Sequence, residues 1–255
     1  MPAMRRRLAT LGTLLVLATS CAVESAPVPS PTRTVEPTAT SPSPTVTATA
    51  TPSLTPSPVV DVPADAPTTY RRRQTPDELP VADLVPVGGE VTMVRRLSPT
   101  SDGVSQIALA WTRGLDPFSS EHGFELWQLF LDAPAWRVVY AFTDVASDGV
   151  LGVRFDVGDL TGDAIPETLT FEDKGGSGAC GVWRVVRSGA GFATPIFHRS
   201  TCDTEIEMAS GTLRIRAAEY EPNDSHCCPS RFRTTTIRWH GSSGWTVVDR
   251  VVTPA

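Results

Sequence analysis

The sequence predicts an all-β fold for residues 86–255, an antiparallel meander of three blade-like repeats. One observation is a period of two in the placement of apolar residues, which is typical of strands with one buried face. This alternation occurs in three segments, 107–111, 213–217 and 235–239. The second observation is a repeat, because tryptophans recur at intervals of 56 residues, at Trp127, Trp183 and Trp239. Closed propellers have about four to eight blades, so three repeats predict an open propeller-like stack or a β-sandwich.

The first 20 residues have the pattern of an export signal. Three arginines at 5–7 are followed by an apolar run over 8–19 that is too short to cross a bilayer. Small residues and Ser20 then precede Cys21, and this stretch resembles the lipobox of bacterial lipoproteins. The resemblance implies a signal peptide over 1–20 and a diacylated Cys21 that anchors the protein to the cell membrane, facing outward. The alternative is ordinary cleavage nearby, which would release a soluble protein with a free Cys21 thiol.

The composition of residues 21–85 predicts a disordered tether. Pro, Thr, Ser, Ala and Val dominate the segment, and without a hydrophobic period it cannot form a core. The formal charge of the whole chain is −6, and loss of the three signal-peptide arginines would change it to −9. An acidic mature chain argues against nucleic acid as a partner. The remaining residues, 86–255, are sufficient for one domain with its own core.

Each tryptophan of the repeat is followed by a polar turn and a second aromatic residue, at Trp136, Phe192 and Trp245. The shared pattern is a strand, a turn, an aromatic residue and a further strand, which predicts a hairpin in each repeat. Coincidence is the alternative, because aromatic residues are common beside hairpin turns. Residues 124–131 fit either a strand or a short helix, since their apolar side chains fall on both faces.

One segment, 158–167, carries a chemically specific pattern of oxygen-bearing residues at alternate positions. It resembles the calcium-type loop of FG-GAP or VCBS repeat proteins. The resemblance implies five calcium ligands, the side chains of Asp159, Thr161, Asp163 and Glu167 and the carbonyl of Ile165. Thr161 replaces the usual Asn or Asp, and Ala164 replaces a glycine whose left-handed backbone costs other residues about 1 to 2 kcal/mol. These departures favour the alternative, a metal-free turn in which Asp side chains accept hydrogen bonds from backbone amides.

The four cysteines after Cys21 predict two disulfides, because they are even in number and the domain is expected to be exported. They are Cys180, Cys202, Cys227 and Cys228. A bridge between the adjacent Cys227 and Cys228 would strain the backbone, so we expect each to pair with a separate partner, Cys180 or Cys202. The alternative is a zinc site that also uses His226, but the chain has no C-x-x-C pair to support it.

The segment from Asp224 to Ser230 reads D-x-x-C-C-P-S and is followed by a strand that ends near Trp239. It resembles the C-terminal signature of the LppP/LprE-type lipoproteins of actinobacteria. The resemblance implies an envelope lipoprotein without an established enzymatic activity, and it supplies no catalytic residues.

The sequence therefore predicts a membrane-anchored, non-catalytic lipoprotein that displays a binding or structural module to an unknown envelope or extracellular ligand. No cofactor is implied except the candidate calcium ion. Residues 176–181 match G-x-G-x-x-G, but a strand rather than a helix is expected after them, which argues against a dinucleotide site. The alternative function is an extracellular, carbohydrate-active hydrolase that uses the carboxylates of 156–173.

Overall fold

The computed structural model describes residues 60–70, 75–97, 103–114, 119–130, 135–145, 151–176, 178–225 and 227–255. The expected signal peptide, Cys21 and the part of the expected tether up to residue 59 lie outside the described residues, as does His226. The described residues belong to one compact unit, 53–255. Within them, no helix is both long enough and apolar enough to span a membrane.

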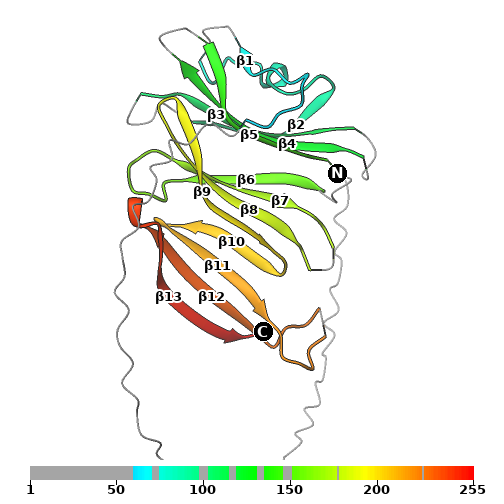
Figure 1. The fold of residues 1–255 in the computed structure, drawn as a ribbon, viewed down its shortest axis with the longest axis vertical. Coiled ribbons are helices and arrows are strands. Elements are labelled where there is room, and N and C mark those ends of the chain that lie inside the picture. Colours follow the sequence, from blue (N-terminus) through cyan, green and yellow to red (C-terminus); the bar gives the residue numbers. More distant parts are fainter. Residues whose placement is uncertain are drawn as a thin grey trace, which may run out of the picture. The chain divides into compact units, whose positions relative to one another are not determined.

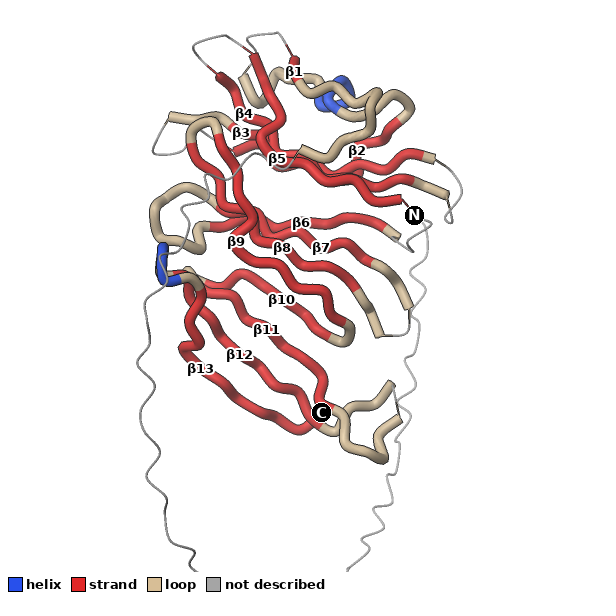
Figure 2. Tube along the Cα trace, in the orientation of Figure 1, coloured by secondary structure: helices blue, strands red, loops and turns tan. Residues whose placement is uncertain are grey.

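Three antiparallel sheets follow one another in sequence order in the described part of the chain (Figures 1 and 2). The first sheet, in the order β1-β5-β4-β3-β2, contains β1 (Thr69–Tyr70), β2 (Gly89–Leu97), β3 (Gln106–Arg113), β4 (Glu121–Phe130) and β5 (Ala135–Val145). The second contains β6 (Gly152–Gly158), β7 (Glu167–Asp173), β8 (Gly181–Gly189) and β9 (Phe192–Thr201). The third contains β10 (Thr204–Ala209), β11 (Thr212–Glu219), β12 (Arg231–Trp239) and β13 (Trp245–Pro254). Two short 3-10 helices, η1 (Val81–Leu84) and η3 (Gly241–Ser243), complete the described elements.

This architecture confirms the predicted all-β fold and its three repeats. Strands β2–β5, β6–β9 and β10–β13 are each a four-stranded meander in which consecutive strands pair. The repeat tryptophans Trp127, Trp183 and Trp239 lie on the third strand of each meander, β4, β8 and β12. The second aromatic residues, Trp136, Phe192 and Trp245, lie at the start of the fourth strand. Residues 124–130 belong to strand β4, so the helical alternative for this segment is wrong.

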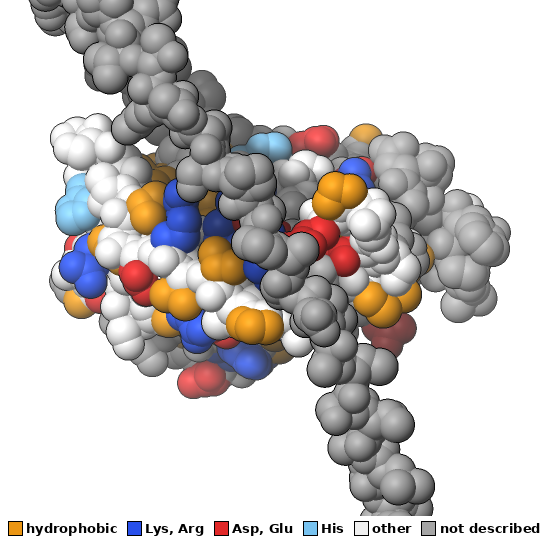
Figure 3. Space-filling view, turned by 90° about the horizontal axis from the view of Figure 1, so that it is seen from below, with side chains coloured by type: hydrophobic (Ala, Val, Ile, Leu, Met, Phe, Trp, Pro, Cys, Tyr) orange, Lys and Arg blue, Asp and Glu red, His pale blue; other side chains and the backbone are white. Residues whose placement is uncertain are grey.

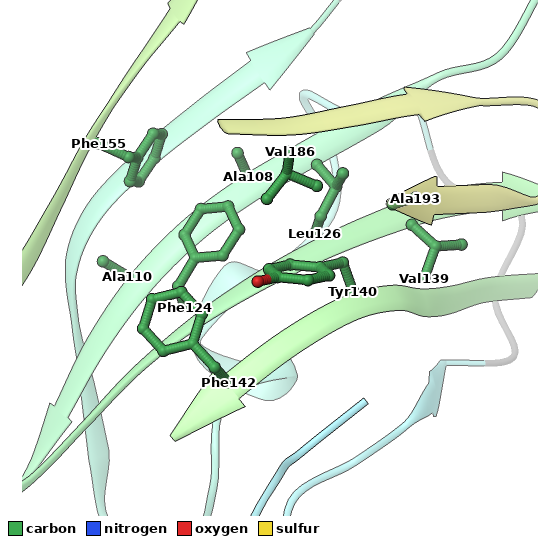
Figure 4. Close-up of a cluster of buried hydrophobic side chains, with 10 residues drawn as sticks. All are labelled: Ala108, Ala110, Phe124, Leu126, Val139, Tyr140, Phe142, Phe155, Val186 and Ala193. Atoms are coloured by element: carbon green, nitrogen blue, oxygen red, sulfur yellow. The ribbon is translucent and has the colours of Figure 1, made fainter. Parts of the chain in front are cut away.

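Two apolar layers hold the three sheets together. Between the first and second sheets, Phe124 stacks on Phe142 with 5.7 Å between ring centroids and meets Phe155 edge-on at 5.3 Å (Figure 4). Between the second and third sheets, the buried residues are Leu160, Leu169, Phe171, Trp183, Val185, Ile206, Leu213, Ile215 and Ile237. Burial of large apolar side chains contributes about 1.5 to 3 kcal/mol each, so these layers fix the stacking of the sheets.

A segment before residue 86 covers the outer face of the first sheet, which corrects the expected end of the tether at residue 85. Leu79, Leu84 and Val85 are buried there against a cluster that includes Trp111 and Trp127. These few apolar residues stand in a proline-rich stretch, so average composition conceals them. Strand β3 is in consequence buried on both faces, whereas its alternating pattern predicted one exposed face.

The last strand differs from all others in its exposure. Four valines of β13 are roughly half exposed, namely Val247, Val248, Val251 and Val252. Figure 3 views this end of the domain and shows hydrophobic and basic side chains interspersed rather than segregated. The third sheet therefore covers the second on one side and leaves its own edge strand open.

Candidate functional site

The acidic loop joins β6 to β7, and its aspartates bond to N–H groups. Asp159 Oδ1 accepts a hydrogen bond from Gly162 N at 2.7 Å. Asp163 Oδ1 accepts one from Ile165 N at 3.0 Å, and its Oδ2 pairs with Arg187 Nη2 on β8 at 2.8 Å. Partial burial would raise the pKa of Asp163, but the hydrogen bonds from Arg187 and Ile165 N outweigh it and lower the pKa. Asp163 is therefore a carboxylate that ties the loop to the second sheet.

Glu167, the first residue of β7, bonds to the other end of the same loop. Its side chain is fully buried, and Oε2 accepts hydrogen bonds from Leu160 N at 2.8 Å and Thr161 N at 3.1 Å. Thr161 Oγ1 donates to the other oxygen at 3.2 Å. Burial has the largest effect and raises the pKa of Glu167 to about 7, although these donors oppose it.

The three carboxylates among the candidate calcium ligands, those of Asp159, Asp163 and Glu167, thus hold the turn together by accepting hydrogen bonds from N–H and O–H donors. Ala164 has φ of 63°, the left-handed conformation expected where the resembled loops carry glycine, and its N–H donates to Asp159 Oδ2 at 3.1 Å. Within the described residues, no group of three or more His, Cys, Asp or Glu side chains is placed to hold a metal ion. The aspartate side chains of the loop accept hydrogen bonds from backbone amides, as the alternative of a turn held by Asp side chains describes.

The cysteines pair differently from the expectation. Cys180 and Cys202 form a disulfide, while Cys227 and Cys228 carry free, exposed thiols. The register of the β8–β9 hairpin explains the bond, because Gly181 opposes Thr201 and the two cysteines are the next residues outward. The expectation that Cys227 and Cys228 each bond to one of these cysteines is wrong in this structure.

A cavity of about 500 Å³ is bordered by the second sheet, the third sheet and the β11–β12 loop, and we call it the inter-sheet cavity. Its aromatic wall consists of Phe171, Trp183, Tyr220 and Phe232. A smaller cavity of about 190 Å³ adjoins it and shares Phe171 and Trp183. Trp183 Nε1 is buried and has no hydrogen-bond partner among the described residues. A volume of a few hundred Å³ with mixed apolar and polar walls is typical of small-molecule sites.

Charged groups complete the wall of the inter-sheet cavity. The Arg154 guanidinium lies 4.7 Å from the Phe171 ring centroid, and that of Arg216 lies 3.4 Å from the Phe232 centroid. Neither arginine forms an ion pair with any carboxylate of the described residues. Three carboxylates line the same cavity, those of Asp173, Asp203 and Glu205. The cavity therefore offers strong hydrogen-bond donors and strong acceptors beside aromatic surface.

One serine–histidine contact is present in the first sheet. Ser120 Oγ and His122 Nε2 are 2.9 Å apart at the start of β4, and Asp144 is the cross-strand partner of His122. Burial lowers the pKa of His122, and the nearby Asp144 charge opposes that effect. Ser120 is only 6% exposed, and neither residue lines the inter-sheet cavity. The burial of the hydroxyl keeps it from a large substrate.

The comparisons with protein families, with curated proteins and with solved structures find no match for this chain. The site is accordingly assigned from its own geometry.

The sequence singled out the acidic loop and the cysteines but missed the cavity residues. Arg154 and Arg216 lie on different sheets, and only the stacking of those sheets brings them to one cavity. Their local patterns carry a weak signal, since each arginine stands between apolar residues in a strand. Three residues that the sequence singled out for other reasons also line the cavity, namely Asp173 of the acidic segment, the repeat tryptophan Trp183 and Cys227.

Proposed function

We propose that this protein is a lipid-anchored, non-catalytic module that faces outward from the cell membrane and binds a small polyhydroxylated ligand of saccharide chemistry in the inter-sheet cavity. The export signal, the lipobox-like stretch before Cys21 and the Pro/Thr/Ser tether support the anchoring. Two acyl chains would give stable attachment where one gives only reversible binding. The tether would hold the domain away from the membrane.

The observation that carries the binding function is the composition of the cavity wall. Sugar hydroxyls both donate and accept hydrogen bonds, so one ligand can engage the Arg154 guanidinium and the Glu205 carboxylate, which line this cavity together. The flat, apolar face of a sugar ring can rest on an aromatic side chain, and Tyr220 is 39% exposed at the cavity. A volume of about 500 Å³ fits one or two sugar rings.

The test is a binding screen by thermal shift and calorimetry with neutral sugars, uronic acids, amino acids and aromatic carboxylates as separate groups. We expect binding within the sugar groups. Arg154→Gln and Glu205→Gln should each lower the affinity about tenfold or more, because a hydrogen bond to a charged group contributes about 1.5 to 3 kcal/mol. Arg238→Gln, an exposed position of β12 outside the cavity, is the matched control and should bind normally.

Three outcomes would contradict the proposal. Binding of amino acids or aromatic acids alone would show that the ligand is not a saccharide. Sugar binding that survives both cavity substitutions would place the site elsewhere. The wild type could also hydrolyse a glycoside and lose this activity in Asp156→Asn or Asp173→Asn with the fold intact. That result would show that the protein is a carbohydrate-active hydrolase and not a binding module.

A further inference from the structure

A single carboxylate, that of Asp224, closes the loop between β11 and β12. Asp224 Oδ2 accepts hydrogen bonds from Glu221 N at 2.7 Å and from Ser230 N at 2.8 Å. Asp224 Oδ1 accepts one from Ser230 Oγ at 2.6 Å. The first and last residues of the D-x-x-C-C-P-S motif therefore bond to each other and close the loop. The two cysteines stand within this closed turn.

Cys227 and Cys228 are already close enough to react with each other. Their Sγ atoms are 3.1 Å apart, and both side chains are exposed. Ser225 contacts both cysteines. Its Oγ lies 3.5 Å from Cys227 Sγ, and its carbonyl accepts a hydrogen bond from Cys228 N at 2.9 Å. The loop thus holds both thiols close together and accessible to solvent.

No other cysteine of the described residues is available to this pair. Cys180 and Cys202 are bonded to each other, and Cys21 is expected to carry lipid. In an oxidising, extracytoplasmic compartment, exposed thiols rarely persist without a partner. Hydrogen bonds from Ser225 and from Cys228 lower the pKa of Cys227, and a thiolate is the form that attacks a disulfide.

We propose that Cys227 and Cys228 are a reversible redox site that closes a vicinal disulfide by exchange with a disulfide-containing oxidant. The backbone strain of a bond between adjacent cysteines makes that bond easily reduced again. The Cys227 thiolate attacks one sulfur of the oxidant, breaks its S–S bond and releases the first thiol, which takes up the proton lost by Cys227. The Cys228 thiolate then attacks Cys227 Sγ and releases the second thiol, which takes up the other proton. Two cysteine thiols are oxidised and one disulfide is reduced to two thiols.

This site borders the inter-sheet cavity, because Cys227 lines it. The redox state of the pair is therefore a property of the cavity wall, whatever ligand the cavity takes. The redox proposal does not depend on the saccharide ligand, since its test measures sulfur chemistry alone.

The test is peptide mapping by mass spectrometry of the full mature protein, before and after treatment with oxidised glutathione, with free thiols alkylated at each stage. The sample is first reduced mildly with dithiothreitol, and at this stage we expect two alkyl groups on the peptide that holds Cys227 and Cys228. After oxidation we expect that peptide to be unalkylated and about 2 Da lighter than its dithiol form without alkyl groups, with the Cys180–Cys202 bond unchanged. Dithiothreitol should restore the two thiols.

Cys228→Ser separates the two steps, because it removes the thiol that resolves the mixed disulfide. We expect this variant to keep a stable glutathione adduct on Cys227, whereas the wild type keeps none. Cys227→Ser is the matched control and should acquire the adduct more slowly, since Cys228 then attacks without the Ser225 contact. A melting curve of each variant shows whether it is folded.

The proposal fails if oxidation produces a bond from Cys227 or Cys228 to Cys180 or Cys202, which would restore the pairing expected from the sequence. It also fails if both thiols remain alkylatable after oxidation, or if wild type and Cys228→Ser retain glutathione equally.

Discussion

Glu125 should make the stability of this protein fall as the pH rises toward neutrality. Its side chain is fully buried in β4, where it accepts hydrogen bonds from Trp111 Nε1 at 2.9 Å and Trp127 Nε1 at 2.7 Å. Burial has the largest effect and raises the pKa of Glu125 to about 7, although the two indole N–H groups oppose it.

The direction and size of this pH effect on stability follow from the pKa of Glu125 in the unfolded and in the folded state. Below the ordinary value of 4.5, Glu125 is protonated in both the folded and unfolded states. Between 4.5 and about 7, the unfolded state loses this proton while the folded state keeps it, so the free energy of unfolding falls as pH rises. At roughly 1.4 kcal/mol per pH unit, the loss is about 3 kcal/mol and is complete above about pH 7. Glu167, whose pKa is also raised to about 7, adds a loss in the same window.

The variant Glu125→Gln isolates this contribution, because glutamine cannot ionise and Glu167 titrates in both proteins. At pH 5 the variant should be less stable by about 1 to 3 kcal/mol, since its amide nitrogen faces one indole N–H. Urea unfolding at pH 5, 6, 7 and 8 gives the stability difference between the two proteins. We expect that difference to shift by about 2.5 kcal/mol in favour of the variant between pH 5 and 8. A difference that stays constant within 1 kcal/mol would refute the reasoning.

Three further substitutions test the fold and the loops, each by urea unfolding at a fixed pH. Gly123→Ala should destabilise the domain by about 1 to 3 kcal/mol, since the added Cβ would meet Trp111 Cε2 at 2.4 Å; an unchanged stability would contradict this contact. Ala164→Gly should raise the stability by up to about 1 kcal/mol, because φ is 63° at this residue, and a loss would argue against the left-handed turn. The double change of Cys180 and Cys202 to serine should cost about 3 kcal/mol, as expected for a bond that spans 22 residues; a cost below 1 kcal/mol would show that the bond is not formed.

The repeated meanders could be predicted from the sequence because strand periodicity and aromatic spacing are local. Trp127 and Trp183 mark equivalent strands, and the hairpin after each follows from the turn and the second aromatic residue. The boundary near residue 85 was missed because Leu79 and Leu84 are isolated apolar residues in a proline-rich stretch. What buries them is the outer face of the first sheet, which no local pattern reveals.

The candidate site could be predicted only where it is formed by residues that are close to one another in the sequence or in one hairpin. The turn at 158–167 closes on its own carboxylates, so the hydrogen bonds from backbone amides to its Asp side chains could be stated in advance. The Cys180–Cys202 bond could have been found by counting outward from the β8–β9 hairpin, because both cysteines flank paired residues. The inter-sheet cavity could not have been found in this way, because Arg154 and Arg216 come to line one cavity only through the packing of two sheets.

The most direct test of an anchored, outward-facing module is the intact mass of the mature protein extracted from membranes, compared with Cys21→Ala. We expect the wild type to lack residues 1–20 and to carry a diacylglyceryl group on Cys21, and the variant to leave the membrane fraction without that mass. A wild-type protein with an unmodified N-terminus, recovered equally from the soluble fraction, would contradict the account.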